Sequence, residues 1–102
     1  NMTHSKSFAK EVNGSSIPRW EEARLSLAEE HAEEERARKE NISLMKQCLD
    51  DAMAIARSKN LQPYQSDMVL MAVTLLNKRA SHAVHWKDSK CKEKFDRKHN
   101  IA

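Results

Sequence analysis

The stretch SKNLQPYQSDMVLMAVTLL, residues 58–76, sets the expected architecture. Its first half is polar and contains Pro63, and Asn60 suits the end of a helix, so it predicts a turn. Its second half, Met68–Leu76, is apolar on nearly all sides and is interrupted only by Thr74. Such a helix needs cover on more than one side. We therefore expect a helix to end, the chain to turn, and a second helix to pack back.

Long helices are predicted on both sides of this turn, at residues 17–58 and 64–98. One Gly and two Pro in 102 residues leave few helix breakers. Ser16 suits the N-cap of the first helix and Pro18 its first turn, while Asn41 is the residue at which this helix would divide. The expected fold class is all-α, a long antiparallel hairpin.

The predicted organisation is a flexible N-terminal tail, residues 1–16, followed by the helical hairpin domain, residues 17–102. Folding the helices together brings Ala56 against Met68–Val69. It also lays the acidic residues 29–36 against the basic residues 88–95, so flanking charges would set the register.

A two-helix hairpin buries too little apolar surface to be stable alone, so we expect more burial from association. The chain would form a homodimer, with two hairpins making a four-helix bundle, or dock on a partner protein. The candidate interface core consists of apolar residues from both helices: Met45, Leu49, Met53, Met68, Val69, Met71, Ala72, Val73, Leu75, Leu76 and Trp86.

Cysteine usage and hydropathy predict the compartment. Cys48 and Cys91 are far apart and form no metal-binding pair motif, which fits a reducing cytoplasm. No basic-then-apolar leader follows Met2, which we take as the natural start, with Asn1 as an added residue. The run Met68–Leu76 is nine residues long, against the roughly 20 needed to span a bilayer. We expect a cytoplasmic protein without a membrane segment.

Nucleic-acid binding is the alternative function. The C-terminal part of the second helix is rich in basic residues, with the aromatic residues Trp86 and Phe95 near them. A basic helix can bind along a phosphate backbone. Asp88, Glu93 and Asp96 in the same stretch oppose this interpretation. The candidate nucleic-acid contacts are Lys87, Lys90, Lys94, Arg97 and Lys98.

A small metal-dependent hydrolase is the third interpretation. His82 and His85 share one helix face and are the candidate metal ligands, whereas Cys91 lies on the opposite side of the helix. The pairs Glu30-x-x-Glu33 and Glu93-x-x-Asp96 resemble the acidic motifs of all-helical nucleotide pyrophosphatases, a resemblance that implies Mg²⁺ binding.

The sequence contains no Gly-rich phosphate loop and no Gly-x-Ser-x-Gly nucleophile motif. Cys91 falls on a stripe with Val84 and Phe95, so we expect it to be buried rather than reactive. We therefore expect no cofactor and no enzymatic activity. The first hypothesis is a small helical protein with a protein-binding or assembly role.

Overall fold

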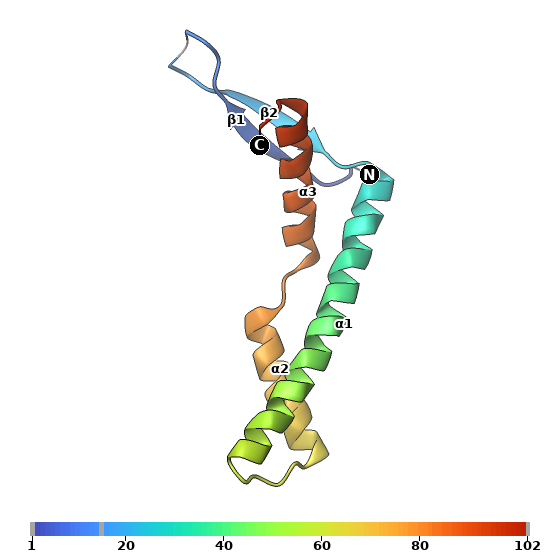
Figure 1. Cartoon of the computed structure of the whole chain (residues 1–102). Coiled ribbons are helices and arrows are strands. Elements are labelled where there is room, and N and C mark those ends of the chain that lie inside the picture. The colour runs from blue at the N-terminus through green and yellow to red at the C-terminus, as the bar shows by residue number, and fades with distance from the viewer. Residues whose placement is uncertain (1, 15, 102) are drawn as a thin grey trace. The chain divides into compact units, whose positions relative to one another are not determined.

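The computed structural model describes residues 2–14 and 16–101 (Figure 1). The elements follow in the order β1 (Ser5–Lys10), β2 (Arg19–Arg24), α1 (Leu27–Ser58), α2 (Gln65–Arg79) and α3 (Ala83–Lys98). They form two compact units. The hairpin unit contains the strands, residues 27–36 of α1 and helix α3; the helix-pair unit spans residues 37–81.

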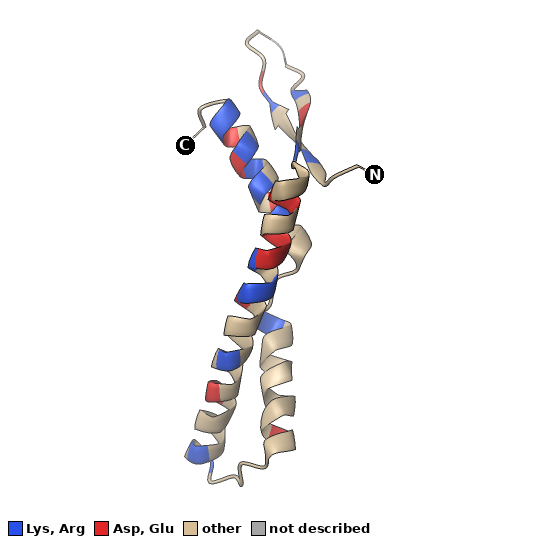
Figure 2. Ribbon diagram, turned by 90° about the vertical axis from the view of Figure 1, so that its right-hand side faces the viewer, with Lys and Arg blue, Asp and Glu red and all other residues tan. Residues whose placement is uncertain are grey.

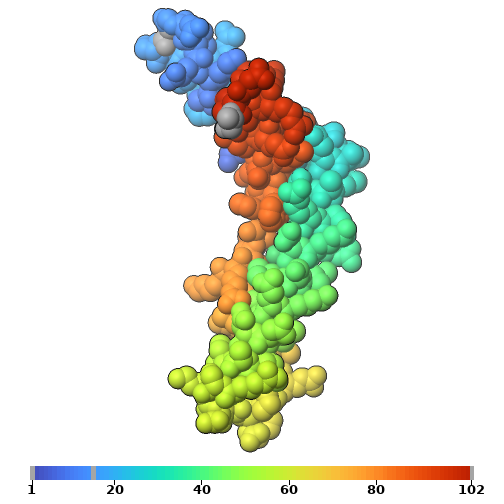
Figure 3. Space-filling model, in the orientation of Figure 1, coloured from blue at the N-terminus to red at the C-terminus, as the bar shows by residue number. Residues whose placement is uncertain are grey.

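In the hairpin unit, β1 and β2 pair antiparallel, with Ser5 opposite Arg24 and Lys10 opposite Arg19. Gly14, in the connection between them, has a φ of 81°, in the left-handed region that favours glycine. The strands lie against α3, as the blue and red atoms of Figure 3 show, and the Phe8 and Phe95 ring centroids are 5.1 Å apart. These rings give the unit part of its apolar core.

The N-terminal segment differs from the prediction. The first helix begins at Leu27 rather than near residue 17, and residues 19–24 form β2. Residues 5–10, predicted as part of a flexible tail, form β1. The all-α fold class is therefore corrected to a mostly helical fold with a small two-stranded hairpin. Asn1 and Ser15 of the predicted tail, and Ala102, lie outside the described residues.

A capping box marks the real start of α1. The Ser26 hydroxyl accepts a hydrogen bond from the Glu29 N–H at 3.1 Å, and the Glu29 carboxylate accepts one from the Ser26 N–H at 2.8 Å. This reciprocal pair satisfies two backbone donors that a helix start otherwise leaves free. The Ser26-x-x-Glu29 pattern was a readable signal in the sequence, and the prediction placed the start ten residues too early because it relied on Ser16 and Pro18.

The predicted second helix, 64–98, is divided into α2 and α3. Ala80 and His82 between them have extended backbone, with ψ of 146° and 158°. Asn41, the predicted joint of the first helix, instead lies inside continuous α1. Its side-chain amide donates to the Ser81 carbonyl at 3.3 Å, so it satisfies an acceptor just beyond the end of α2.

The helix-pair unit contains the predicted turn. Asn60 has a φ of 55°, Leu61 N–H donates to the Ala56 carbonyl at 2.8 Å, and Asn60 N–H donates to the Arg57 carbonyl at 3.3 Å. This is a Schellman motif, and it confirms that Asn60 ends the first helix. Beyond the turn, Ala56 and Met68 belong to one buried cluster, which confirms the predicted pairing of α1 with α2.

Candidate protein-association site

The contact between α1 and α2 is made mainly of small side chains. Cys48, Ala52, Ala56 and Ala72 are fully buried, and Met68 is 5% exposed. Small residues let two helices approach closely, but each buries far less apolar area than a leucine or valine. The larger apolar side chains of the pair therefore lie on its flanks, where the partner helix covers them only in part.

Several of these flanking side chains are exposed to solvent. On α2, Val69 is 43% exposed, Leu70 66% and Val73 37%; on α1, Ile42 is 49% and Ile55 41% exposed. Val69, Leu70 and Val73 are neighbours on the surface of α2, and exposed apolar side chains grouped in this way are typical of an interaction site.

The predicted interface core divides between the two units. Met68 and Ala72 are buried within the helix pair, and Val69 and Val73 are exposed. Trp86 is half-buried in the hairpin unit, with the Arg36 guanidinium 5.5 Å from its ring centroid. The remaining predicted core residues are half-buried in the helix-pair unit: Met45, Leu49, Met53, Met71, Leu75 and Leu76.

One flank of α2 combines an apolar groove with a pattern of charges. A groove of about 230 Å³ is lined by Ile55, Met71, Thr74 and Leu75. Helix α2 carries no charge between Asp67 and Lys78, so its charged residues lie only near its ends (Figure 2). Asp67, Met71, Thr74 and Lys78 are spaced i, i+4, i+7 and i+11 and so share one side of the helix. We call this side, with the groove, the Thr74 flank.

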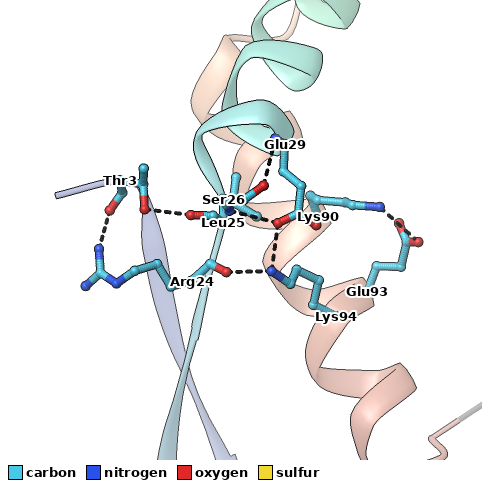
Figure 4. Close-up of polar contacts among 8 residues, drawn as sticks. All are labelled: Thr3, Arg24, Leu25, Ser26, Glu29, Lys90, Glu93 and Lys94. Carbon is cyan, nitrogen blue, oxygen red and sulfur yellow. Dashed lines mark hydrogen bonds and ion pairs between the residues drawn. The ribbon is translucent and has the colours of Figure 1, made fainter.

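One lysine of the predicted basic stretch, Lys94, contacts an acidic residue of α1, whereas Lys90 and Lys92 pair with acidic residues of α3 itself. Lys94 donates to the Glu29 carboxylate and to the Arg24 carbonyl, each at 2.7 Å (Figure 4). Lys87 lies 3.2 Å from Glu30 and 3.0 Å from Glu34. The predicted apposition of acidic and basic residues is therefore confirmed for Lys94, and Lys87, just before the predicted basic stretch, makes contacts of the same kind. The hydrogen bond from Lys94 is the main reason that the pKa of Glu29 falls from 4.5 to about 2.

The other candidate nucleic-acid contacts are also paired. Lys90 lies 3.3 Å from Glu93, Arg97 also pairs with Glu93, and Lys98 pairs with Glu21. Each of the five cationic side chains in the alternative interpretation therefore has a carboxylate neighbour within the hairpin unit.

The candidate metal ligands lie near the start of α3. His82 is its N-cap, and the His85 ring stands edge-on to Trp86 at 5.2 Å between centroids; both histidines are exposed. Across residues 2–14 and 16–101, no three or more His, Cys, Asp or Glu side chains are grouped so that they could hold a metal ion.

The acidic pairs that resemble pyrophosphatase motifs contact cations of the chain itself. Glu30 pairs with Lys87, and Asp96 lies 2.5 Å from Lys92. Glu33 is 5% exposed and lies 3.4 Å from the Arg36 Nε. Cys91 is fully buried, as predicted, and burial raises the pKa of its thiol, which disfavours the reactive thiolate. Val84, placed on the same stripe, is 55% exposed.

A set of contacts between the strands and α3 escaped the sequence-based prediction. His4 Nε2 lies 2.6 Å from the Asp88 carboxylate, and Lys6 lies 3.7 Å from it. Near the other end of α3, Glu21 contacts both Lys98 and His99. These partners are 77 to 84 residues apart, so no local pattern could have revealed them.

Within the described part of the chain, no helix combines the length and the apolar character needed to cross a membrane. No protein-family model, no curated protein and no solved structure matches the chain.

Proposed function

We propose that this chain is a non-enzymatic assembly protein of the cytoplasm that acts through helix–helix association. It would form a homodimer in which two helix pairs make a four-helix bundle, or it would dock on another protein. The observation that carries the proposal is the inverted distribution of apolar residues: small side chains fill the contact between α1 and α2, while larger apolar side chains of both helices, such as Ile55 and Leu70, are exposed.

The energetics favour association of this unit. Fully burying a valine or leucine side chain contributes about 1.5–3 kcal/mol, so a few such side chains can offset much of the entropy lost on binding. Residues 68–77 of α2 contain no charged side chain that would keep the surface solvated. Four-helix bundles form by this route, with apolar flanks of antiparallel helices meeting in a shared core.

Nucleic-acid binding is the second candidate function. Its support is the outward position of some cations, since the Arg97 and Lys98 side chains are 72% and 66% exposed. The carboxylate beside each one weighs against it, because phosphate groups would have to displace or tolerate those neighbours. Metal-dependent hydrolysis ranks third, because lysines occupy carboxylates that a cation would need.

Light scattering on the purified chain tests the first proposal. At micromolar concentrations we expect a mass of twice 11.8 kDa. A chain that stays at 11.8 kDa would contradict the homodimer. Val84→Asp serves as a control for the effect of an added surface charge. Val84 is an exposed apolar residue of α3, outside the helix-pair unit, so this variant should keep the dimer mass.

Titration with duplex and single-stranded oligonucleotides at two salt concentrations tests the second candidate. Binding that weakens steeply as salt rises would favour nucleic-acid recognition. Absence of binding at low salt would remove it.

A further inference from the structure

We propose that the occupant of the Thr74 flank is a second copy of the chain, docked with its α2 antiparallel to the first. This inference rests on the proposed function. It adds which molecule associates, which face of α2 it covers, and how the two helices are oriented. Along the helix, the two-fold axis lies at the level of residues 72 and 73. Met71 of each copy then faces Thr74 of the other.

The charges of α2 are complementary to themselves in this arrangement. Asp67 and Lys78 are exposed, and within the described part of the chain neither has an ion-pair partner. An antiparallel dimer places Asp67 of each copy opposite Lys78 of the other, which gives two intermolecular ion pairs. A parallel dimer would place like charges opposite each other. Charges at the ends of an apolar stripe select helix direction in this way.

The groove supplies the apolar contact between those ion pairs. Ile55, Met71 and Leu75 line it from two helices, so a second copy would cover side chains of both α1 and α2. Thr74, the polar member of the lining, donates its hydroxyl to the Leu70 carbonyl at 3.0 Å. Its donor is therefore already satisfied, and covering it leaves no unpaired hydroxyl hydrogen.

Self-complementarity is what identifies the second copy as the partner. An isologous two-fold contact requires one patch to match itself, and a stripe with an acid at one end and a lysine at the other does so only when the partner is reversed. The opposite flank of α2, with Val69 and Val73, has exposed apolar residues but no comparable pair of terminal charges on its own side. In this arrangement it stays outside the contact.

The first experiment compares two substitutions of neighbouring residues by sedimentation equilibrium. Thr74→Glu places a carboxylate at the centre of the contact and should raise the dimer dissociation constant about 30-fold or more. Val73→Glu places the same charge on the opposite flank and should leave the constant nearly unchanged. Circular dichroism verifies that both variants keep their helix content. If Val73→Glu dissociates the dimer and Thr74→Glu does not, the proposed face is wrong, while the assembly function stands.

The second experiment tests direction by exchanging charges. Asp67→Lys and Lys78→Glu should each weaken self-association about 10-fold, because each replaces two attractive pairs by repulsive ones. Mixing the two variants in equal amounts should restore association, since all pairs are then of opposite sign. A parallel dimer already opposes like charges, so neither substitution would weaken it, and that result would overturn the proposal.

The mixture also separates pairing from helix stability. Asp67 and Lys78 lie near the favourable ends of the helix dipole, so either substitution could weaken α2 itself. If self-association were lost because α2 is weakened, the loss would persist in the mixture. That result would contradict the proposed pairing of Asp67 with Lys78. A wild-type chain that is monomeric at every concentration would instead remove the homodimer altogether.

Discussion

At the scale of single residues, Glu29 carries more interactions than its place at the start of α1 suggests. It closes the capping box with Ser26 and accepts a hydrogen bond from Lys94 of α3. One carboxylate therefore caps the start of α1 and also links α1 to α3, through Lys94, which lies 65 residues away in sequence. Charge-assisted bonds of this kind are about twice as strong as neutral ones.

We predict that Glu29→Gln lowers the free energy of unfolding by about 1–2 kcal/mol at neutral pH, because it weakens the cap and removes the ion pair. The folded-state pKa of Glu29 is about 2, below its ordinary 4.5, so its contribution is present above pH 4.5 and disappears as the pH falls toward 2. The difference between variant and wild type should shrink over that interval in urea denaturation.

Glu40→Gln serves as the control for this measurement, because Glu40 is an exposed carboxylate in the same helix. It should change stability by no more than about 0.5 kcal/mol. A Glu29→Gln variant that behaves like this control at neutral pH would show that the cap and the Lys94 contact contribute little.

At the scale of elements, the strands are attached to α3 by side chains near both of its ends. Asp88 binds His4 and Lys6, while Glu21 binds Lys98 and His99. The Phe8 and Phe95 rings pack between these two polar contacts. An isolated two-stranded hairpin is marginal in water, so the attachment to α3 is what makes this one stable.

We predict that acid releases the strands from α3. Lys98, followed by His99, lowers the pKa of Glu21 below 4.5, and His4 lowers that of Asp88 below 3.8. Both carboxylates therefore stabilise the folded unit above those values and lose this effect as the pH falls through their lowered pKa values. Amide protection in β1 and β2, corrected for intrinsic exchange rates, should fall before protection in α2.

Variants at neutral pH check the same contacts. Glu21→Gln and Asp88→Asn should lower protection of the strands, whereas Glu11→Gln, in the exposed connection, should not. Strands that remain protected in both variants would show that the Phe8–Phe95 packing alone holds them.

At the scale of the whole molecule, the two units contribute differently to stability. The hairpin unit has an aromatic contact and ion pairs, while the helix-pair unit has a narrow core of small residues. A unit with so little buried area gains most from association.

We therefore predict that the melting temperature of the wild-type chain rises with protein concentration, as expected when the folded state is dimeric. Calorimetry over an about 100-fold concentration range measures this dependence. Thr74→Glu should weaken the dependence or shift it to higher concentrations, and Val84→Asp should leave it unchanged. A wild-type melting temperature that is independent of concentration would contradict association of the folded chain.

Local pattern was sufficient for much of this fold. The scarcity of Gly and Pro, the apolar run Met68–Leu76 and the turn at Asn60 predicted two helices that pack antiparallel, and the opposed charges predicted contacts such as Lys94 with Glu29. These features depend on neighbouring residues or on a simple antiparallel register, so periodicity and capping rules can reach them.

Only the tertiary structure decided the rest. Residues 5–10 and 19–24 are strands because they pair with each other and pack on α3, and the helix breaks at 80–82 without a Pro or Gly. It also decided that alanines and Cys48 fill the contact between α1 and α2, so that Val69, Leu70 and Val73 stay outside. Each outcome depends on partners distant in sequence, whose contact energies outweigh the small local preferences of the chain.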